Sequence, residues 1–263
     1  MTETTPNPVT IYERFRNLKS IEDRGLMPQH VAIIMDGNRH WAREKFGEDA
    51  KPIQGHAQGM ENIVGILRDL REIRAIRYIT LWAFSPENWQ RDPEEVSALM
   101  DLFAKAIPAT LPEVKADNGR FVHLGRKDRI TPQVRQALAA AESETAGNTG
   151  QTVCLAIDYG SEDQEVRVMQ RLVDLGLAKG TLVTPAMLKD LRDTHLNDGT
   201  DIPPIDLVFR TSGQQRLSGL PNAEYAEFYP ITSTLPSATT ADFVKGLSVY
   251  AQTDRRFGGN STK

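Results

Sequence analysis

The sequence predicts an α/β fold: a single domain whose central, mostly parallel sheet of six strands is flanked by helices. Short unbroken apolar runs, such as residues 30–35, are rich in β-branched side chains and are typical of strands buried on both faces. Longer stretches between such runs, as at residues 60–75, repeat apolar residues at helical spacing. Because strands and helices alternate along the chain, the strands are expected to run parallel, with helices on both faces of the sheet.

The individual elements follow from local chemistry. Residues 1–27 form a polar N-terminal arm with one amphipathic stretch, residues 9–18. Asp92 and Pro93 begin a helix, because Asp caps free backbone N–H groups and Pro fits the first turn. Apolar runs and turn residues set the other boundaries. We expect strands at residues 30–35, 76–84, 121–125, 152–158, 206–210 and 226–229, and helices at residues 60–75, from 92 through 107, from 131, at 165–175 and at 242–253.

Composition narrows the possible functions. The chain has 263 residues and a net charge of −4, so its overall charge gives no reason to expect nucleic-acid binding. An anionic substrate would need a local cluster of Arg and Lys. The single cysteine, Cys154, lies in an apolar run and is expected to be a small buried hydrophobe. No run approaches the roughly 20 apolar residues that span a membrane, and no signal-peptide pattern is present. We therefore expect a cytoplasmic protein, which would touch a membrane at its periphery if its product were apolar.

Three predicted strands end in polar segments that carry chemistry. These segments are residues 36–40 (Asp-Gly-Asn-Arg-His), 85–91 (Ser-Pro-Glu-Asn-Trp-Gln-Arg) and 210–216 (Arg-Thr-Ser-Gly-Gln-Gln-Arg). Ligands of open parallel sheets bind at the carboxyl ends of the strands. The three segments are therefore expected to meet at one edge of the sheet.

The first segment suits an anion that is bound together with a metal ion. Gly37 lets the backbone turn tightly, and free N–H groups at the next helix start attract an anion. Asp36 repels a bare phosphate but can hold Mg²⁺, which bridges the two. Arg39, His40 and Arg43 add positive or donor groups. From the spacing alone, an ordinary strand-to-helix turn with Asp36 as its cap explains the segment equally well.

The other two segments also have two interpretations. Arg210 and Arg216, with hydroxyls and a Gly between them, suit a diphosphate because Arg presents forked donors that match phosphate oxygens; the alternative is a solvated surface loop. Asn88 and Arg91 could reach phosphate, and Trp89 between them could face an apolar chain or simply be packed.

Two further residues are ambiguous when taken alone. His56 precedes helical residues, where a lone His is most often a satisfied hydrogen-bonding group. Glu227 lies in a short apolar run, where a carboxylate is either paired or a metal ligand. Together the residues indicate a diphosphate site with Mg²⁺, but they do not define the reaction.

Four segments resemble the signatures of the cis-prenyltransferases, the undecaprenyl diphosphate synthase family. They are residues 30–42 (His-Val-Ala-Ile-Ile-Met-Asp-Gly-Asn-Arg-His-Trp-Ala), 83–91 (Ala-Phe-Ser-Pro-Glu-Asn-Trp-Gln-Arg), 206–218 with 225–227, and the tail 255–259. The resemblance implies a catalytic domain at residues 28–259, followed by a short tail at 260–263. It also implies a homodimer and condensation of isopentenyl diphosphate onto an allylic diphosphate such as farnesyl diphosphate. The product would be an undecaprenyl-type polyprenyl diphosphate.

The resemblance implies roles for individual residues. Mg²⁺ binds Asp36, with Glu227 as a second metal-linked carboxylate that is reached across the dimer or through the shared ion. The residues implied in catalysis are Asp36, Asn38, His56 and Asn88. Those implied in substrate binding are Gly37, Arg39, His40, Trp41, Arg43, Lys51, Ser85, Trp89, Arg91, Arg210, Arg216 and Ser218. The tail resembles one that closes over phosphates of the neighbouring subunit, and the apolar stripes of residues 60–70 and 96–107 would wall an apolar tunnel.

The chain departs from the family pattern at several positions. His40 and Gln214 stand where the family has Arg and Glu, and Lys51 is the candidate to replace an Arg that normally precedes His56. The segment between Ser218 and Tyr225 is shorter and holds Pro221. Two alternatives therefore stand beside the long-chain synthase: a short-chain or irregular (head-to-middle) synthase, and a non-catalytic partner subunit. Product analysis separates the long-chain synthase from the short-chain or irregular one. Retention of the charged motif residues argues against a non-catalytic subunit.

Overall fold

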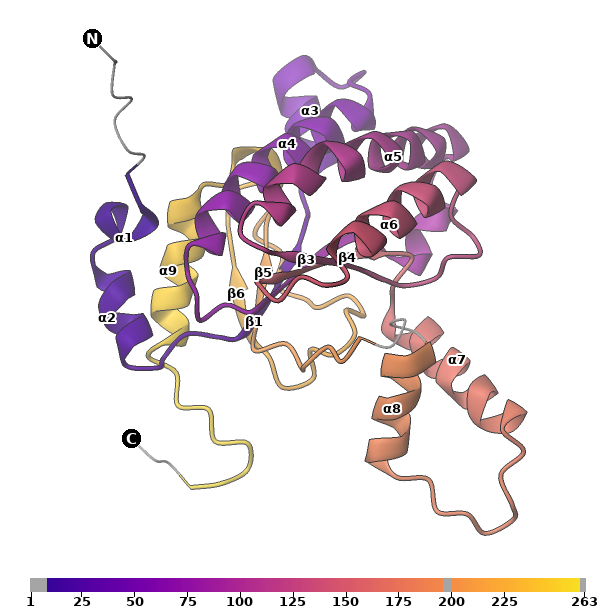
Figure 1. Cartoon of the computed structure of the whole chain (residues 1–263). Helices are drawn as coiled ribbons and strands as arrows, with labels where there is room; N and C mark the ends of the chain where they lie inside the picture. The colour runs from indigo at the N-terminus through magenta and orange to yellow at the C-terminus, as the bar shows by residue number, and fades with distance from the viewer. Residues whose placement is uncertain (1–8, 196–199, 261–263) are drawn as a thin grey trace.

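The computed structural model describes residues 9–195 and 200–260, in which six strands form one sheet flanked by helices (Figure 1). All strand pairs are parallel, in the order β3-β4-β2-β1-β5-β6. The predicted fold class, an α/β domain with a six-stranded sheet flanked by helices, is confirmed. The strands are β1 His30–Ile34, β2 Tyr78–Phe84, β3 Arg120–Leu124, β4 Thr152–Ile157, β5 Leu207–Arg210 and β6 Glu227–Pro230.

The helices differ from the expected ones in several places. Helix α4 begins at Pro52 rather than near residue 60, because its first turns carry glycines and polar residues that give no apolar periodicity. Helix α8, over residues 185–195, was not predicted from the sequence. The α-helices are α1 Ile11–Arg14, α2 Asn17–Asp23, α3 Asn38–Phe46, α4 Pro52–Arg71, α5 Pro93–Lys115, α6 Pro132–Thr145, α7 Ser161–Asp174, α8 Pro185–His195 and α9 Thr240–Tyr250, and the 3₁₀ helices are η1 Pro86–Gln90 and η2 Leu235–Ser237.

Alternate residues of each strand supply two hydrophobic cores. In β1, Val31 and Ile33 join the larger core under α4, α5, α6 and α9, whereas Ala32 and Ile34 join a smaller core on the other face. Among the described residues, that smaller core is formed by strands and connecting segments and contains no helix residue, so the expectation of helices packed on both faces is not met there. Cys154 lies fully buried in the smaller core, as expected, and burial raises the pKa of its thiol to about 12. Burial on both faces explains why the strands read as unbroken apolar runs.

Helix α5 forms as its sequence predicts. The Asp92 side chain accepts a hydrogen bond from the Glu94 backbone N–H at 2.8 Å, and Pro93 occupies the first turn. The predicted stripe of Val96, Leu99, Met100, Phe103 and Ile107 is buried. Across residues 9–195 and 200–260, no helix has both the length and the apolar character required to cross a membrane.

Candidate active site

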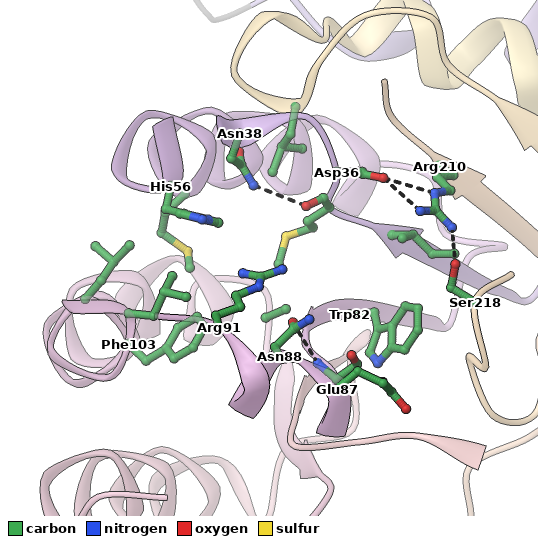
Figure 2. A pocket seen from close by; sticks show the side chains of 18 residues that line it. Asp36, Asn38, His56, Trp82, Glu87, Asn88, Arg91, Phe103, Arg210 and Ser218 are labelled. Carbon is green, nitrogen blue, oxygen red and sulfur yellow. Dashed lines mark hydrogen bonds and ion pairs between the residues drawn. The ribbon is translucent and has the colours of Figure 1, made fainter. Parts of the chain in front are cut away.

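The carboxyl ends of β1, β2 and β5 meet at one edge of the sheet, where they border a pocket of about 310 Å³. The segments that follow these strands contribute side chains to the same pocket, as the parallel topology led us to expect (Figure 2). Apolar residues from α4 and α5 line its inner side. Its polar lining residues include Asp36, Asn38, His56, Ser85, Glu87, Asn88, Arg91, Arg210 and Ser218.

Asp36 lies on the turn between β1 and α3, and it is not the helix cap. Gly37 is the N-cap residue of α3, with a φ of 91°, and its backbone N–H donates to Asp36 Oδ1 at 2.7 Å. A Cβ at Gly37 would lie 2.9 Å from side-chain atoms of Ser212 and Thr234. Only glycine therefore fits this turn. The turn leaves the Asp36 carboxylate at the pocket.

A buried arginine from β5 holds the Asp36 carboxylate. Arg210 donates to Asp36 Oδ2 from Nη2 at 2.8 Å and from Nε at 3.2 Å (Figure 2). Its Nη1 donates to Ser218 Oγ at 2.7 Å and to the Arg216 carbonyl oxygen at 2.5 Å. The Arg210 side chain is 6% exposed and that of Asp36 is 36% exposed. The guanidinium is thus fixed on two sides, while the carboxylate remains accessible to a ligand.

Thr211 fixes the backbone of Asp36, a role that sequence reasoning missed. Its hydroxyl accepts from the Asp36 N–H at 2.8 Å and donates to the Asp36 carbonyl oxygen at 2.7 Å. The Leu235 N–H donates to the same carbonyl oxygen at 3.0 Å. Thr211 is fully buried. Its only sequence signal was a hydroxyl residue directly after the strand that delivers Arg210.

Asn38, the first residue of α3, packs closely against α4 because two glycines of α4 have no side chains. A Cβ at Gly55 would lie 1.9 Å from the Asn38 carbonyl oxygen, and one at Gly59 would lie 2.2 Å from Asn38 Oδ1. The Asn38 side chain donates from Nδ2 to the Met35 carbonyl oxygen at 3.2 Å, and the residue is 8% exposed. This close packing holds the Asn38 amide beside Asp36 in the pocket wall.

Basic side chains gather at the outer side of the site. A second pocket, of about 280 Å³, shares Asp36, Asn38, His56 and Arg91 with the first and is lined as well by other basic residues. Burial lowers the pKa of the Arg91 guanidinium, and the nearby Arg39 charge adds to this effect. The additional basic residues of the second pocket are Arg39, His40, Arg43 and Arg216.

A further carboxylate that the sequence did not single out contacts these groups. Glu95, in the first turn of α5, has a side chain that is 8% exposed. Its contact with His56 is the main cause that holds the pKa of Glu95 below its ordinary value. From sequence alone, acids at this position indicate only compensation of the helix dipole.

Three of the predicted substrate-binding residues lie outside both pockets. Trp41 packs edge-on against Phe46, with ring centroids 5.7 Å apart. Trp89 packs edge-on against Phe84 at 5.0 Å. Lys51 is the exposed N-cap residue of α4. The packed interpretation therefore describes Trp89 in this structure.

A third pocket lies between α4, α5 and the sheet, and its lining is mostly apolar. Met60 and Phe103 line both this pocket and the first one, so the polar site adjoins an apolar space. The stripe residues Ile63, Leu67 and Ile107 also line it. Arg68, Arg71, Glu113 and Gln151 lie among its lining residues as well.

Comparison with known proteins identifies the family of this chain. Residues 34–258 match the prenyltransferase family described as "Putative undecaprenyl diphosphate synthase". The chain belongs to this family. An isoprenyl transferase of Rhizobium meliloti is 39% identical over 235 residues, which cover 89% of this chain and 93% of the relative. An isoprenyl transferase of Geobacter sulfurreducens is 36% identical over 239 residues, which cover 90% and 95% of the two chains.

Two solved structures resemble this chain in fold. The lavandulyl diphosphate synthase of Lavandula x intermedia, crystallised with dimethylallyl diphosphate, superposes with a TM-score of 0.80 at 28% identity, covering 89% of this chain and 99% of that one. A probable undecaprenyl diphosphate synthase of Campylobacter jejuni gives a TM-score of 0.66 at 25% identity, covering 88% and 98%. As a member of the undecaprenyl diphosphate synthase family, this protein is a prenyltransferase of isoprenoid biosynthesis that carries out cis-prenyl chain elongation.

The residues of this prenyltransferase suit a magnesium ion that arrives with a diphosphate. Within the described residues, no group of three or more His, Cys, Asp or Glu side chains is placed to hold a metal. Asp36 offers one accessible carboxylate beside a basic pocket. Mg²⁺ is commonly bound by one or two carboxylates together with substrate phosphates, so this donor set fits it.

Glu227 lies at the other end of the sheet. It is level with Leu207 and Val31, at the amino ends of their strands, whereas Asp36 follows the carboxyl end of β1. At about 3.3 Å per strand residue, the two carboxylates are more than 10 Å apart in one chain and cannot share one ion there. Glu227 Oε1 instead lies 3.9 Å from Arg255 Nε, and Arg255 Nη1 is 2.7 Å from Asp206 Oδ1. The tail therefore contacts its own chain near Glu227.

Proposed function

We propose that this protein condenses isopentenyl diphosphate onto an allylic diphosphate, such as farnesyl diphosphate, and releases diphosphate to make an undecaprenyl-type polyprenyl diphosphate. One observation carries the proposal: the first polar pocket, which His56, Arg91 and Arg210 line, adjoins an apolar pocket, with Met60 and Phe103 lining both. A prenyl diphosphate has the same polarity, with a charged head and an apolar chain. Membership of the undecaprenyl diphosphate synthase family supports the same reaction.

In this proposal the allylic diphosphate occupies the outer pocket. Arg39, Arg43 and Arg91 meet its oxygens, and His40 adds a donor, although His40 Nε2 also lies 3.3 Å from Glu44 Oε1. Asp36 would hold Mg²⁺, which supplies charge neutralisation for the departing diphosphate when it is bound. Cationic groups that are already in place stabilise the charge that develops on the leaving group.

The second diphosphate belongs near β5. We assign isopentenyl diphosphate to Arg210, Arg216 and Ser218, three residues that line the two polar pockets. Asn38, His56 and Asn88 line the space between the two diphosphate positions and would act on the reacting carbons. Asn88 Oδ1 accepts from the Ser85 N–H at 3.1 Å, which orients the Asn88 amide (Figure 2).

The growing chain would extend between α4 and α5. The apolar pocket there has a volume of about 50 Å³, so a long product requires the two helices to separate and form a tunnel. This small volume favours a second candidate function, a short-chain or irregular synthase. The structural likeness to lavandulyl diphosphate synthase favours the same alternative.

Product mass separates the two functions. Purified protein is incubated with farnesyl diphosphate, labelled isopentenyl diphosphate and Mg²⁺, and the products are resolved by mass. We expect a ladder that ends in a product of many isoprene units. If no product is longer than about three units, which is the length of the farnesyl primer itself, the long-chain proposal is wrong. Omission of Mg²⁺ and an Asp36→Ala variant should each abolish product, and full activity in the variant would overturn the role of Asp36.

The assembly and location are also proposals. We propose a homodimer in which Glu227 and residues 255–259 of one subunit serve the site of the other, because neither reaches Asp36 of its own chain. We further propose that residues 28–259 form the catalytic unit, between the arm 1–27 and the tail 260–263. The enzyme would work in the cytoplasm and touch the membrane only through its product.

A further inference from the structure

The carboxylate of Glu95 lies behind the basic wall of the site. Its Oε1 is 3.3 Å from Arg39 Nε, 3.3 Å from Arg91 Nη1 and 3.6 Å from His56 Nε2. The three partners come from different elements, since Arg39 is on α3, His56 is on α4 and Arg91 ends η1. A single oxygen atom therefore connects three parts of the fold.

The partners face the pockets, whereas Glu95 does not. Arg91 and His56 line both polar pockets, and Arg39 lines the outer one. Glu95, itself a described residue, lines neither of the two polar pockets. Figure 2 shows the Arg91 guanidinium pointing into the space that Asp36, Asn38 and His56 surround. Glu95 thus contacts the side chains that would meet a diphosphate, without meeting it itself.

Compensation of the helix dipole does not explain this placement. Glu94 lies in the same turn of α5 and is exposed, and an exposed acid interacts with the dipole without being desolvated. Burial of a carboxylate is unfavourable unless the group is paired. The Glu95 side chain is 8% exposed and has three potentially cationic neighbours. Pairing with these neighbours therefore compensates for the burial of the carboxylate.

We propose that Glu95 is a positioning residue that fixes Arg39, Arg91 and His56 in the orientation that receives the diphosphate. The inference rests on the proposed function and deepens the account of the same site. Two effects of Glu95 oppose each other. Its negative charge repels an anionic substrate, whereas its contacts hold two mutually repelling arginines together. The sign of the change in anion affinity after Glu95 is neutralised therefore shows which effect dominates.

The test uses the full-length protein and inorganic pyrophosphate, with binding measured by isothermal titration calorimetry. Misplaced binding groups are costly, so we expect Glu95→Gln to bind pyrophosphate about tenfold more weakly than the unaltered protein. The KM for the allylic diphosphate should rise more than kcat falls. A loss of folded enzyme would instead lower the apparent kcat alone, so the two causes can be distinguished. Glu95→Asp keeps the charge and should restore part of the affinity. Glu94→Gln removes a charge one residue away and should change neither quantity.

Two results would overturn the proposal. One is pyrophosphate binding by Glu95→Gln that equals or exceeds that of the unaltered protein, and the other is an equal loss in Glu94→Gln. If thermal unfolding shows that Glu95→Gln does not fold, Glu95→Asp decides, because undiminished affinity in that variant would also refute positioning. Failure of the unaltered protein to bind pyrophosphate would instead sink the proposed function, and this is seen before any variant is compared.

Discussion

Replacement of Thr211 by valine tests how firmly the site must hold Asp36. Valine has nearly the shape of threonine, so the buried space stays filled while the hydroxyl is lost. Both bonds of that hydroxyl to the Asp36 backbone, at 2.8 and 2.7 Å, disappear. The Asp36 N–H keeps a bond to the Ile34 carbonyl oxygen at 3.0 Å, and the Asp36 carbonyl oxygen keeps its bond from the Leu235 N–H at 3.0 Å.

The magnitude follows from these contacts. A hydrogen bond contributes about 1 kcal/mol net, and neither backbone group is left without a partner, so Thr211→Val should lower the free energy of unfolding by about 1–2 kcal/mol. Thr211→Ser keeps the hydroxyl but removes one buried methyl group, which costs about 1 kcal/mol. The two variants should therefore have similar stabilities in urea denaturation, with unchanged m-values.

Activity then distinguishes the two variants. If the hydroxyl positions Asp36, kcat should fall about tenfold in Thr211→Val, since small displacements of reacting groups are costly. Thr211→Ser should retain most of the activity. The reasoning is refuted if Thr211→Val keeps full kcat, or if the serine variant loses as much as the valine variant.

Two further predictions concern the sheet and the packing of α4. Burial lowers the pKa of His30 to about 4, so between about pH 6.5 and 4 the unfolded chain binds a proton that the native protein does not. The free energy of unfolding should therefore fall as pH falls through this range, by about 3 kcal/mol in total. Urea denaturation at several pH values should show a smaller fall for His30→Gln. An equal dependence on pH in the two proteins would contradict the assignment of this effect to His30. Gly59→Ala would place a Cβ 2.2 Å from Asn38 Oδ1 and should lower the free energy of unfolding by about 1–3 kcal/mol. Gly65→Ala on the same helix meets nothing within 4 Å and should raise that free energy by about 0.5–1 kcal/mol, as measured by thermal unfolding. A Gly59→Ala variant as stable as the unaltered protein would refute the packing argument.

The parts of the site that depend on strand topology could be predicted from the sequence. Buried β-branched runs indicated parallel strands, and parallel strands bring their carboxyl ends to one edge. The polar segments after β1, β2 and β5 could therefore be placed together before their contacts were known. The same reasoning does not reach side-chain partners, because Thr211 contacts Asp36 across 175 positions of sequence.

The sequence predicts less where residue type does not determine the environment of a side chain. Trp41 and Trp89 stand within segments that carry the site, yet both pack against Phe side chains. Glu95 looked like an ordinary acid at a helix start, and the positioning role that we propose for it depends on burial, which the helical pattern does not encode. Gly55 and Gly59 break the apolar periodicity of α4 because they admit Asn38, so the feature that shapes the site also concealed the first turns of the helix.

The Asp36–Arg210 pair shows how a protein of net charge −4 can prepare a site for a multiply charged anion. A buried guanidinium is costly without a counter-ion, and Asp36 supplies one in the absence of ligand. Arg210 also donates to Ser218 Oγ and to the Arg216 carbonyl oxygen, and neither bond depends on Asp36. The carboxylate could therefore turn toward a magnesium ion while the guanidinium stays in place and receives phosphate oxygens instead. This exchange requires Asp36 to be the accessible partner and Arg210 the buried one, and their exposures of 36% and 6% have that order.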